Sequence, residues 1–153
     1  SDVHDVATRR RNMAAIRGKD TKPELIIRKG LHARGLRYRL HDPRLPGRPD
    51  LVFRARNAVI FVNGCFWHGH DCPLCVMPKT RTEFWQDKIA GNRKRDAVAL
   101  EALGSNGWRT AVVWECALKG RQRLEPNAMI DMVAAWLSSD DATIVLRGIP
   151  AAG

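Results

Sequence analysis

The sequence predicts a small α/β domain in which helices cover a mixed sheet. Amphipathic or capped helical stretches and short apolar stretches follow one another in the order helix, three strands, helix, strand, helix. With 153 residues, 44% of them hydrophobic, the chain is long enough for one domain with its own core. No apolar run approaches the length of a membrane span, so we expect no membrane association.

The first helix is expected from about residue 21 to Gly35. Asp20 or Thr21 can cap its start, Pro23 suits its first turn, and Gly35 is a natural stop. Its apolar stripe consists of Leu25, Ile27 and Leu31.

Three strand patterns follow this helix. Residues 36–40 alternate apolar and basic side chains, and residues 50–53 and 58–62 are almost wholly apolar. The segment 42–49 (DPRLPGRP) has turn chemistry. If 50–53 and 58–62 pair as a hairpin, Asp50 and the 63–72 loop lie at the same end of the sheet.

The second half of the chain continues with a helix over 82–104, capped by Thr82, and a strand over 108–116. The final helix is expected over 124–137, and the tail after Ser138 is expected to be irregular.

The charge balance favours a polyanionic partner. Lys and Arg number 26 against 16 Asp and Glu, which gives a net charge of +10 and a pI near 10.2. Such a surface fits nucleic acid better than anionic lipid. The basic N-terminal residues are not followed by an apolar segment, so we expect no secretory signal and a cytoplasmic protein. In such a protein, clustered cysteines favour metal binding over disulfides.

The stretch CFWHGHDC (65–72) carries the pattern C-x4-H-x-C, formed by Cys65, His70 and Cys72. Thiolate and imidazole ligands suit tetrahedral zinc, and a structural site needs a fourth ligand. Spacing alone nominates Cys75, which forms a CxxC with Cys72. Cys116 is the distant alternative, and it would pin the strand 108–116 to this loop.

A second chemical signal is Asp50, which follows Gly-Arg-Pro and opens an apolar strand. Pro-Asp before a strand recurs in a large group of DNA-cleaving enzymes, where the acid holds Mg2+ at the scissile phosphate. Those enzymes normally carry Glu-x-Lys on the next strand, and Phe61, Val62 and Asn63 stand there instead. We therefore expect His68 to act as the general base.

These residues resemble one family, the very short patch repair (Vsr) DNA mismatch endonucleases. The resemblance covers roughly residues 1–137 and rests on DVHD, LPGRPD, GCFWH, TRTEFW and VWECAL. It implies a restriction-endonuclease-like fold and a strand nick 5′ to the thymine of a T:G mismatch, which begins repair of deaminated 5-methylcytosine. It also implies a monomer with catalytic Mg2+ and structural Zn2+, acting in the nucleoid, with mismatch-repair proteins as further partners.

The resemblance assigns roles by position. It implies that Asp50 and the backbone carbonyl of Val62 hold Mg2+, that His68 activates water, and that Glu24 is an acid near the metal. Asn63 stands where the family often has histidine. The implied zinc ligands are Cys65, His70, Cys72 and Cys116, which leaves Cys75 without a role. The implied DNA wedges are Phe66, Trp67 and Trp85 in the major groove and Met13 and Ile16 on the minor-groove side.

The resemblance divides the chain into a basic DNA-embracing segment (1–20), a nuclease domain (21–138) and a tail (139–153). Three other functions are compatible with parts of the sequence. These are a zinc-braced DNA-binding module, a dimeric restriction-type nuclease and a zinc-ribbon interaction protein. A metal-binding Asp50 argues against the first, wedge aromatics against the second, and the charge of +10 against the third.

Overall fold

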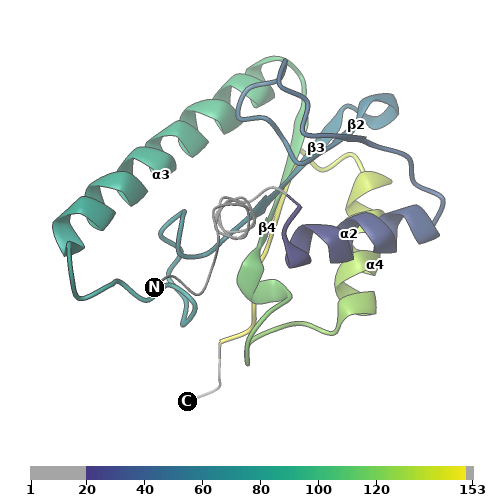
Figure 1. Ribbon diagram of the computed structural model, residues 1–153. Helices are drawn as coiled ribbons and strands as arrows, with labels where there is room; N and C mark the ends of the chain where they lie inside the picture. The colour runs from purple at the N-terminus through teal and green to yellow at the C-terminus, as the bar shows by residue number, and fades with distance from the viewer. Residues whose placement is uncertain (1–19, 151–153) are drawn as a thin grey trace, which may run out of the picture.

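A computed structural model describes residues 20–150, which form three layers, with one sheet between two layers of helices (Figure 1). Helices α2 (Lys22–Ala33) and α4 (Pro126–Leu137) cover one face, and α3 (Thr82–Ser105) covers the other. Short 3-10 turns η1 (Arg54–Arg56) and η2 (Glu115–Ala117) follow two of the strands.

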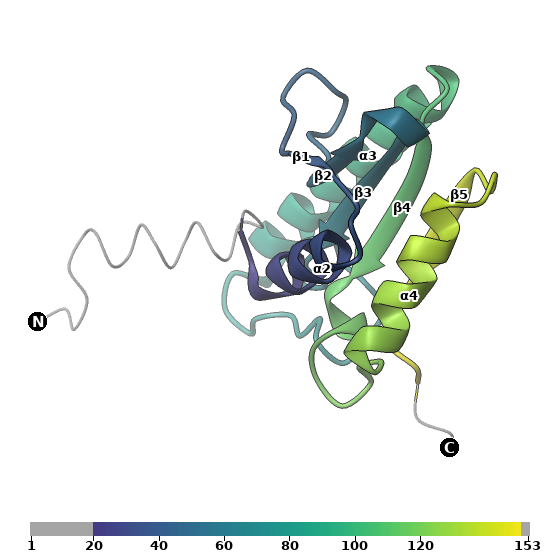
Figure 2. The ribbon, with the colours of Figure 1, turned by 90° about the vertical axis from the view of Figure 1, so that its right-hand side faces the viewer.

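The sheet has five strands in the order β1-β2-β3-β4-β5 (Figure 2). Strands β1 and β2, and β2 and β3, pair antiparallel, whereas β3, β4 and β5 run parallel. The sheet is therefore mixed, as the sequence predicts. The strands are β1 (Arg39–Leu40), β2 (Leu51–Phe53), β3 (Ala58–Asn63), β4 (Arg109–Trp114) and β5 (Thr143–Leu146).

The larger part of the core lies between the sheet and the α2/α4 layer. Ile27 and Leu31 of α2 are fully buried there, against Met129 and Ile130 of α4 and alternate residues of the strands. A smaller cluster on the α3 face contains Leu103. Apolar side chains thus face both sides of the central strands, which explains their nearly continuous apolar sequence.

Helix α2 begins where the sequence predicts. Thr21 is its N-cap and accepts a hydrogen bond from the N–H of Glu24, at 3.4 Å, and Pro23 lies in the first turn. The cap predicted for α3 is wrong. Arg81 takes the N-cap position, and the Thr82 hydroxyl donates to the carbonyl of Pro78 instead.

Two further expectations need correction. The first strand is shorter than predicted, because only Arg39–Leu40 pairs with β2. The tail after Ser138 is not irregular throughout, because residues 143–146 form β5, parallel to β4. Ile144 and Leu146 of this strand pack against the α2/α4 side of the core, which a mostly polar surrounding sequence does not reveal.

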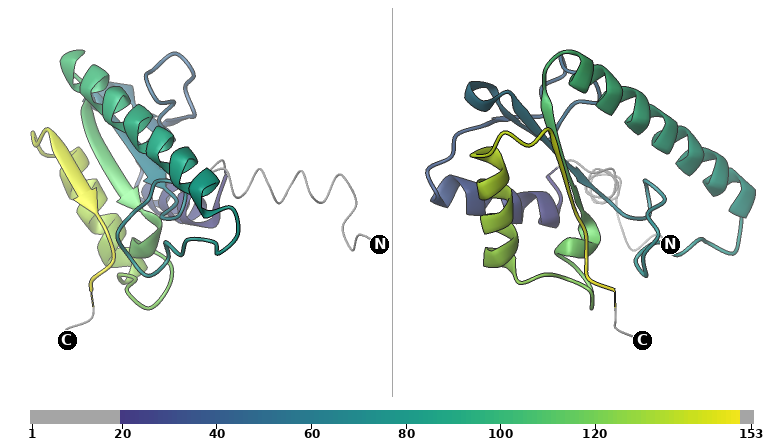
Figure 3. Two further views of the ribbon diagram at one scale, coloured as in Figure 1. Left: turned by 90° about the vertical axis from the view of Figure 1, so that its left-hand side faces the viewer. Right: turned by 180° about the vertical axis from the view of Figure 1, so that it is seen from behind.

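The long connection between β3 and α3 lies at the carboxyl end of the parallel strands (Figure 3). It contains the Cys- and His-rich stretch, and it returns to α3 on the opposite face from α2 and α4. None of the helices in the described part of the chain has the length and apolar character that crossing a membrane requires.

Candidate active site and metal centre

The three parallel strands bring a Cys/His cluster together by their register. Asn63 pairs with Trp114, and Val113 pairs with Leu146. Because parallel strands end at the same edge of a sheet, the residues just beyond β3, β4 and β5 become neighbours. Cys65, Cys116 and Gly148 are the residues two positions beyond these three strand ends.

Four potential ligands meet at this edge. The ligand atoms of the group lie within 4.8 Å of one another, and the Nδ1 of His70 is 3.6 Å from each of the sulfurs of Cys65 and Cys116. The four residues are Cys65, His70, Cys72 and Cys116. Cys75, which spacing alone nominates, is not in the group. Its backbone N–H donates to the carbonyl of Cys72.

The surroundings of the sulfurs fit a soft divalent cation. The N–H of Cys116 donates to the sulfur of Cys65, and the N–H of Gly148 donates to the sulfur of Cys116, each at 3.3 Å. Burial raises the pKa values of the Cys65 and Cys116 thiols above their ordinary value. Thiolates here therefore need a compensating positive charge, and three cysteines with one histidine are a zinc donor set.

His70 is held in place by its neighbours. Its ring stacks on Trp114 with centroids 4.1 Å apart and planes 12° from parallel. Burial lowers the pKa of His70, which favours the neutral ring that a metal requires. The next residue, Asp71, accepts a hydrogen bond from Arg147 at 2.8 Å, so the segment after β5 also fastens this loop.

Between the first two ligands, the loop presents aromatic side chains. The ring of Phe66 lies 5.2 Å from Trp67 and 5.6 Å from Trp85, and the two tryptophans are 5.7 Å apart. Phe66 and Trp67 line a cleft of about 720 Å³. All three side chains are only partly buried, so their faces are available to a large ligand.

His68 lies in the same loop and also lines the cleft. Its Nδ1 contacts a carboxylate oxygen of Asp96 in α3, so Asp96 engages Nδ1 and not Nε2. Gly69 has a φ of +61° and packs so closely on Ile89 that an added Cβ would approach to 2.6 Å. This glycine therefore lets the loop press on α3, where Asp96 lies.

Asp50 also lines this cleft. Its Oδ2 accepts a 2.7 Å hydrogen bond from the N–H of Val62, because β2 and β3 form the predicted hairpin. Burial raises the pKa of Asp50 to about 8. The hydrogen bond from Val62 opposes this rise, and the charge of Glu24 adds to it. Val62 and Asn63 line the cleft beside it.

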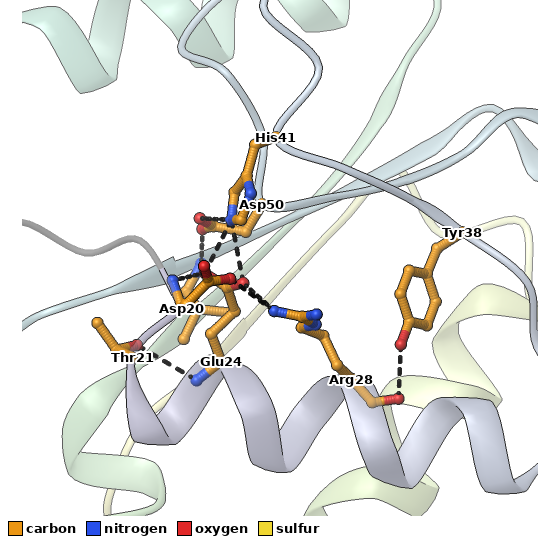
Figure 4. A network of polar contacts seen from close by, with 8 residues as sticks. Asp20, Thr21, Glu24, Arg28, Tyr38, His41 and Asp50 are labelled. Carbon is orange, nitrogen blue, oxygen red and sulfur yellow. Dashed lines mark hydrogen bonds and ion pairs between the residues drawn. The ribbon is translucent and has the colours of Figure 1, made fainter. Parts of the chain in front are cut away.

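Glu24 lies in the first turn of α2, with its side chain fully buried (Figure 4). Arg28, one turn later, donates to Glu24 Oε2 at 3.2 Å, and the N–H of Asp20 donates to Oε1 at 3.3 Å. The Nε2 of His41 lies 3.1 and 3.0 Å from the two oxygens. Glu24 thus joins the start of α2 to His41, whose N–H donates to the carbonyl of Asp50.

The structure brings most of the predicted residues to one cleft. Asp50, Val62, Asn63, Phe66, Trp67 and His68 line it. Glu24 and Trp85 contact residues next to or on the cleft lining. Glu24 contacts His41, which lies 3.8 Å from Asp50, and Trp85 packs against Trp67. Met13 and Ile16 fall outside the described residues.

Sequence reasoning missed two members of this site. Asp96 is one of many charged residues along α3, and nothing in the local sequence distinguishes it. His41 could have been found by extending the hairpin pattern. Its N–H donates to the carbonyl of Asp50, one step beyond the paired Leu40 and Leu51.

Comparison with known proteins identifies the family of this chain. Residues 1–74 match the model of the family described as DNA mismatch endonuclease Vsr. The DNA mismatch endonuclease Vsr of Escherichia coli is 46% identical over 143 residues, which cover 94% of this chain and 92% of that protein. The type II nicking enzyme V.XorIIP of Xanthomonas oryzae pv. oryzae is 50% identical over 117 residues, which cover 76% and 86%.

A further nicking enzyme, V.NmeAIP of Neisseria meningitidis, is 41% identical over 121 residues, covering 79% of this chain and 86% of the relative. The matches thus extend well beyond the metal-centre motif, across the strands and helices that position the cleft. The chain belongs to the DNA mismatch endonuclease Vsr family.

Proposed function

We propose that this protein is a DNA endonuclease that nicks one strand 5′ to the thymine of a T:G mismatch. The nick would begin the repair of deaminated 5-methylcytosine. Membership of the family and similarity to nicking enzymes support an endonuclease acting on mismatched DNA. The net charge of +10 supports a nucleic-acid substrate.

One observation carries the proposal: a single cleft is lined by a largely buried carboxylate, a carboxylate-paired histidine and two clustered aromatic rings. Asp50 supplies the first, His68 with Asp96 the second, and Phe66 with Trp67 the third. A binding module has no use for the first two groups, and a nuclease for intact sites has no use for the third. Together they fit cleavage beside a distorted base step.

In this proposal Asp50 and the carbonyl of Val62 hold Mg2+, for which oxygen donors are the preferred ligands. The ion, when bound, supplies charge stabilisation at the scissile phosphate. His68 takes a proton from the attacking water through Nε2, while Asp96 fixes the orientation of the ring at Nδ1. Asn63 offers hydrogen bonds to water or phosphate, and Glu24 supports Asp50 through His41.

The aromatic cluster is proposed to read the mismatch. A mismatched step is easier to unstack, and ring stacking on exposed bases recovers roughly 1–3 kcal/mol per base. Phe66, Trp67 and Trp85 would enter from the major groove, and Met13 and Ile16 would act from the minor groove. Residues 1–20 would then form a DNA-embracing segment beside a nuclease domain at 21–138, with residues 139–153 as its tail.

The Cys/His cluster is proposed to hold structural Zn2+ that braces the loop carrying Phe66, Trp67 and His68. Three of its four members are buried, which fits a closed structural site. We further propose that the protein acts as a monomer in the nucleoid and cooperates with mismatch-repair proteins.

A strand-specific nicking assay tests the proposal. Duplexes would carry one T:G pair in several flanking contexts, with a T:A duplex as control, in Mg2+ and in EDTA. We expect a Mg2+-dependent nick 5′ to the mismatched thymine only. Cutting of both strands in T:A duplexes would instead establish a restriction-type nuclease, and mismatch binding without cutting in any context would reduce the protein to a DNA-binding module.

A further inference from the structure

The turn at residues 72–75 carries a thiol that neither the Cys/His cluster nor the proposed reaction uses. Cys72 and Cys75 begin and end the segment Cys-Pro-Leu-Cys, and both are half-buried free cysteines. Cys65 and Cys116, the other two cysteines of the cluster, are buried. Reagents in solvent therefore reach Cys72 and Cys75 more readily than the two buried sulfurs.

The backbone of this turn holds the two cysteines close together. The N–H of Cys75 donates to the carbonyl of Cys72 at 3.1 Å, which closes a β-turn with Pro73 in its second position. The Cα atoms at the ends of a β-turn lie less than about 7 Å apart, and those of a disulfide are about 4.4–6.8 Å apart. The turn thus brings Cys72 and Cys75 into the range that a disulfide requires.

Cys72 belongs at the same time to the Cys/His cluster. Its sulfur lies within 4.8 Å of the ligand atoms of Cys65, His70 and Cys116, and it is the one member of the cluster that is not buried. The sulfurs of Cys65 and Cys116 also accept a backbone N–H each. Cys72 is therefore the ligand that solvent and the Cys75 thiol reach most readily.

We propose that Cys72 and Cys75 form a reversible disulfide site, at which a small disulfide such as oxidised glutathione withdraws Cys72 from the Cys/His cluster and releases zinc. Zinc binds the thiolate form of a cysteine, and a sulfur in a disulfide no longer carries that charge. Oxidation would leave the ion with Cys65, His70 and Cys116 alone. The inference rests on the proposal that this cluster holds zinc, and it is independent of the nicking reaction.

The reaction is thiol–disulfide exchange in two steps. The Cys72 thiolate attacks one sulfur of oxidised glutathione, the S–S bond of glutathione breaks, and one glutathione thiolate leaves. The Cys75 thiol loses its proton to solvent and attacks the Cys72 sulfur of this mixed disulfide, which forms the new S–S bond and expels the second glutathione thiolate. The two cysteines lose two electrons, which the two glutathione molecules gain, so excess reduced glutathione reverses the reaction.

The turn is also part of the cleft wall. Leu74, between the two cysteines, lines the cleft and packs against Gly120, where an added Cβ would come within 3.2 Å of its side chain. The loop held by Cys72 carries Phe66 and Trp67, which line the same cleft. Oxidation of this site should therefore change the cleft as well as the zinc content.

Zinc occupancy in glutathione buffers tests this site. The zinc-loaded full chain would be equilibrated at increasing ratios of oxidised to reduced glutathione, and a chromogenic chelator would measure the zinc released. Chymotrypsin, which cuts after aromatic residues and leucine, separates the three cysteines of residues 65–75 for mass spectrometry. We expect a link between Cys72 and Cys75 to appear in step with zinc release, and both changes to reverse on addition of dithiothreitol.

Cys75→Ser is the decisive variant. Without the second thiol of the turn, Cys72 loses its partner for ring closure, so half-release of zinc should need a ratio of oxidised to reduced glutathione at least about tenfold higher. The matched control is Val76→Ser, which changes the neighbouring exposed side chain and keeps both thiols. Its zinc release should match that of the wild type. Circular dichroism and zinc content under reducing conditions would verify that each variant is folded.

Two results would overturn the site. One is an oxidised wild type in which Cys72 is linked to Cys65 or Cys116 while Cys75 remains a thiol. The other is a Cys75→Ser chain that releases zinc at the wild-type ratio. A reduced wild type without zinc would refute the zinc assignment itself before any oxidant is added. Loss of nicking in the DNA assay would leave the glutathione titration unchanged, so the inference and the proposed function fail separately.

Discussion

The backbone N–H of Cys116 donates a hydrogen bond to the sulfur of Cys65, 51 positions earlier in the chain. This contact follows from the parallel pairing of β3 with β4, whose last residues are partners in the ladder. The pairing of β3 with β4 therefore brings the members of the Cys/His cluster together, and formation of the sheet fixes the position of the cleft-lining loop.

Cys116→Ser should lose bound zinc and stability, because it removes a buried donor from the cluster. We expect a loss of about 3 kcal/mol or more in the free energy of unfolding, a fall in Tm on the order of 10 °C. Elemental analysis and thermal unfolding would measure both. The control is Cys75→Ser, which should retain one zinc per chain; the opposite pattern would return the fourth ligand to the CxxC pair.

Gly148→Ala should weaken the same cluster from the other side. An added Cβ would come within 2.5 Å of the carbonyl of Cys116 and 2.7 Å of that of Gln122, both of them backbone atoms. We expect a cost of about 1–3 kcal/mol and faster release of zinc to a chelator. Gly104→Ala is the control, because a Cβ added there on α3 meets open space and should not destabilise the protein. Equal rates of zinc release from the two variants would mean that Gly148 does not support the Cys/His cluster.

Asp96→Asn should slow nicking through His68. The amide cannot hold the imidazole as the carboxylate does, so kcat should fall by roughly 10²–10⁴-fold, with KM for DNA nearly unchanged. A pH–rate profile should change shape as well, which a purely structural role would not cause. Asp87→Asn, an exposed acid on the same helix, is the control. A wild-type kcat for Asp96→Asn would remove this pair from the mechanism.

Trp67→Ala should reduce discrimination between T:G and T:A duplexes. Loss of one stacking partner costs roughly 1–3 kcal/mol of binding, which should fall on the mismatched duplex alone. Competition binding with both duplexes at fixed salt would measure the ratio. Unchanged discrimination with normal zinc content would make Trp67 a packing residue of the aromatic cluster.

Asp50→Asn should abolish nicking, retain DNA binding and alter the pH dependence of stability. In the Mg2+-free protein the folded pKa of Asp50, about 8, exceeds the ordinary 3.8. The folded state therefore holds the extra proton between these values, and its stability falls as pH rises through this window.

Urea unfolding at pH 5 to 9 would show that fall in the wild type, on the order of 1–3 kcal/mol, and a flatter profile for Asp50→Asn. The variant should thus be relatively more stable at pH 8.5 without Mg2+. Parallel profiles for the two proteins would mean that Asp50 titrates normally. Nicking at wild-type rate would exclude Asp50 from the reaction, whatever its titration.

The local sequence predicted most of the architecture because its signals are local. The Thr21 cap, the apolar β2 and β3 segments and the turn before Asp50 each depend on a few neighbouring residues, and each appears in the structure. Strand β5 was missed because it depends on pairing with β4, which lies more than thirty residues earlier in the chain.

The same distinction applies to the site. CFWHGHDC identifies itself by composition, whereas the contact of His68 with Asp96 and that of His41 with Glu24 depend on tertiary packing. Spacing favoured Cys75 over Cys116 for the same reason. Two cysteines close in sequence are visible at once, whereas the register of a parallel ladder is not.

The segment from Cys65 to His70 begins and ends at members of the Cys/His cluster and contains Phe66, Trp67 and His68 of the cleft. Side chains within it can be exchanged while its length is held constant, because adding or deleting one residue would shift His70 away from the sulfurs. Evolution or engineering of a new base preference in this protein should therefore proceed by substitution within these positions and not by insertion or deletion.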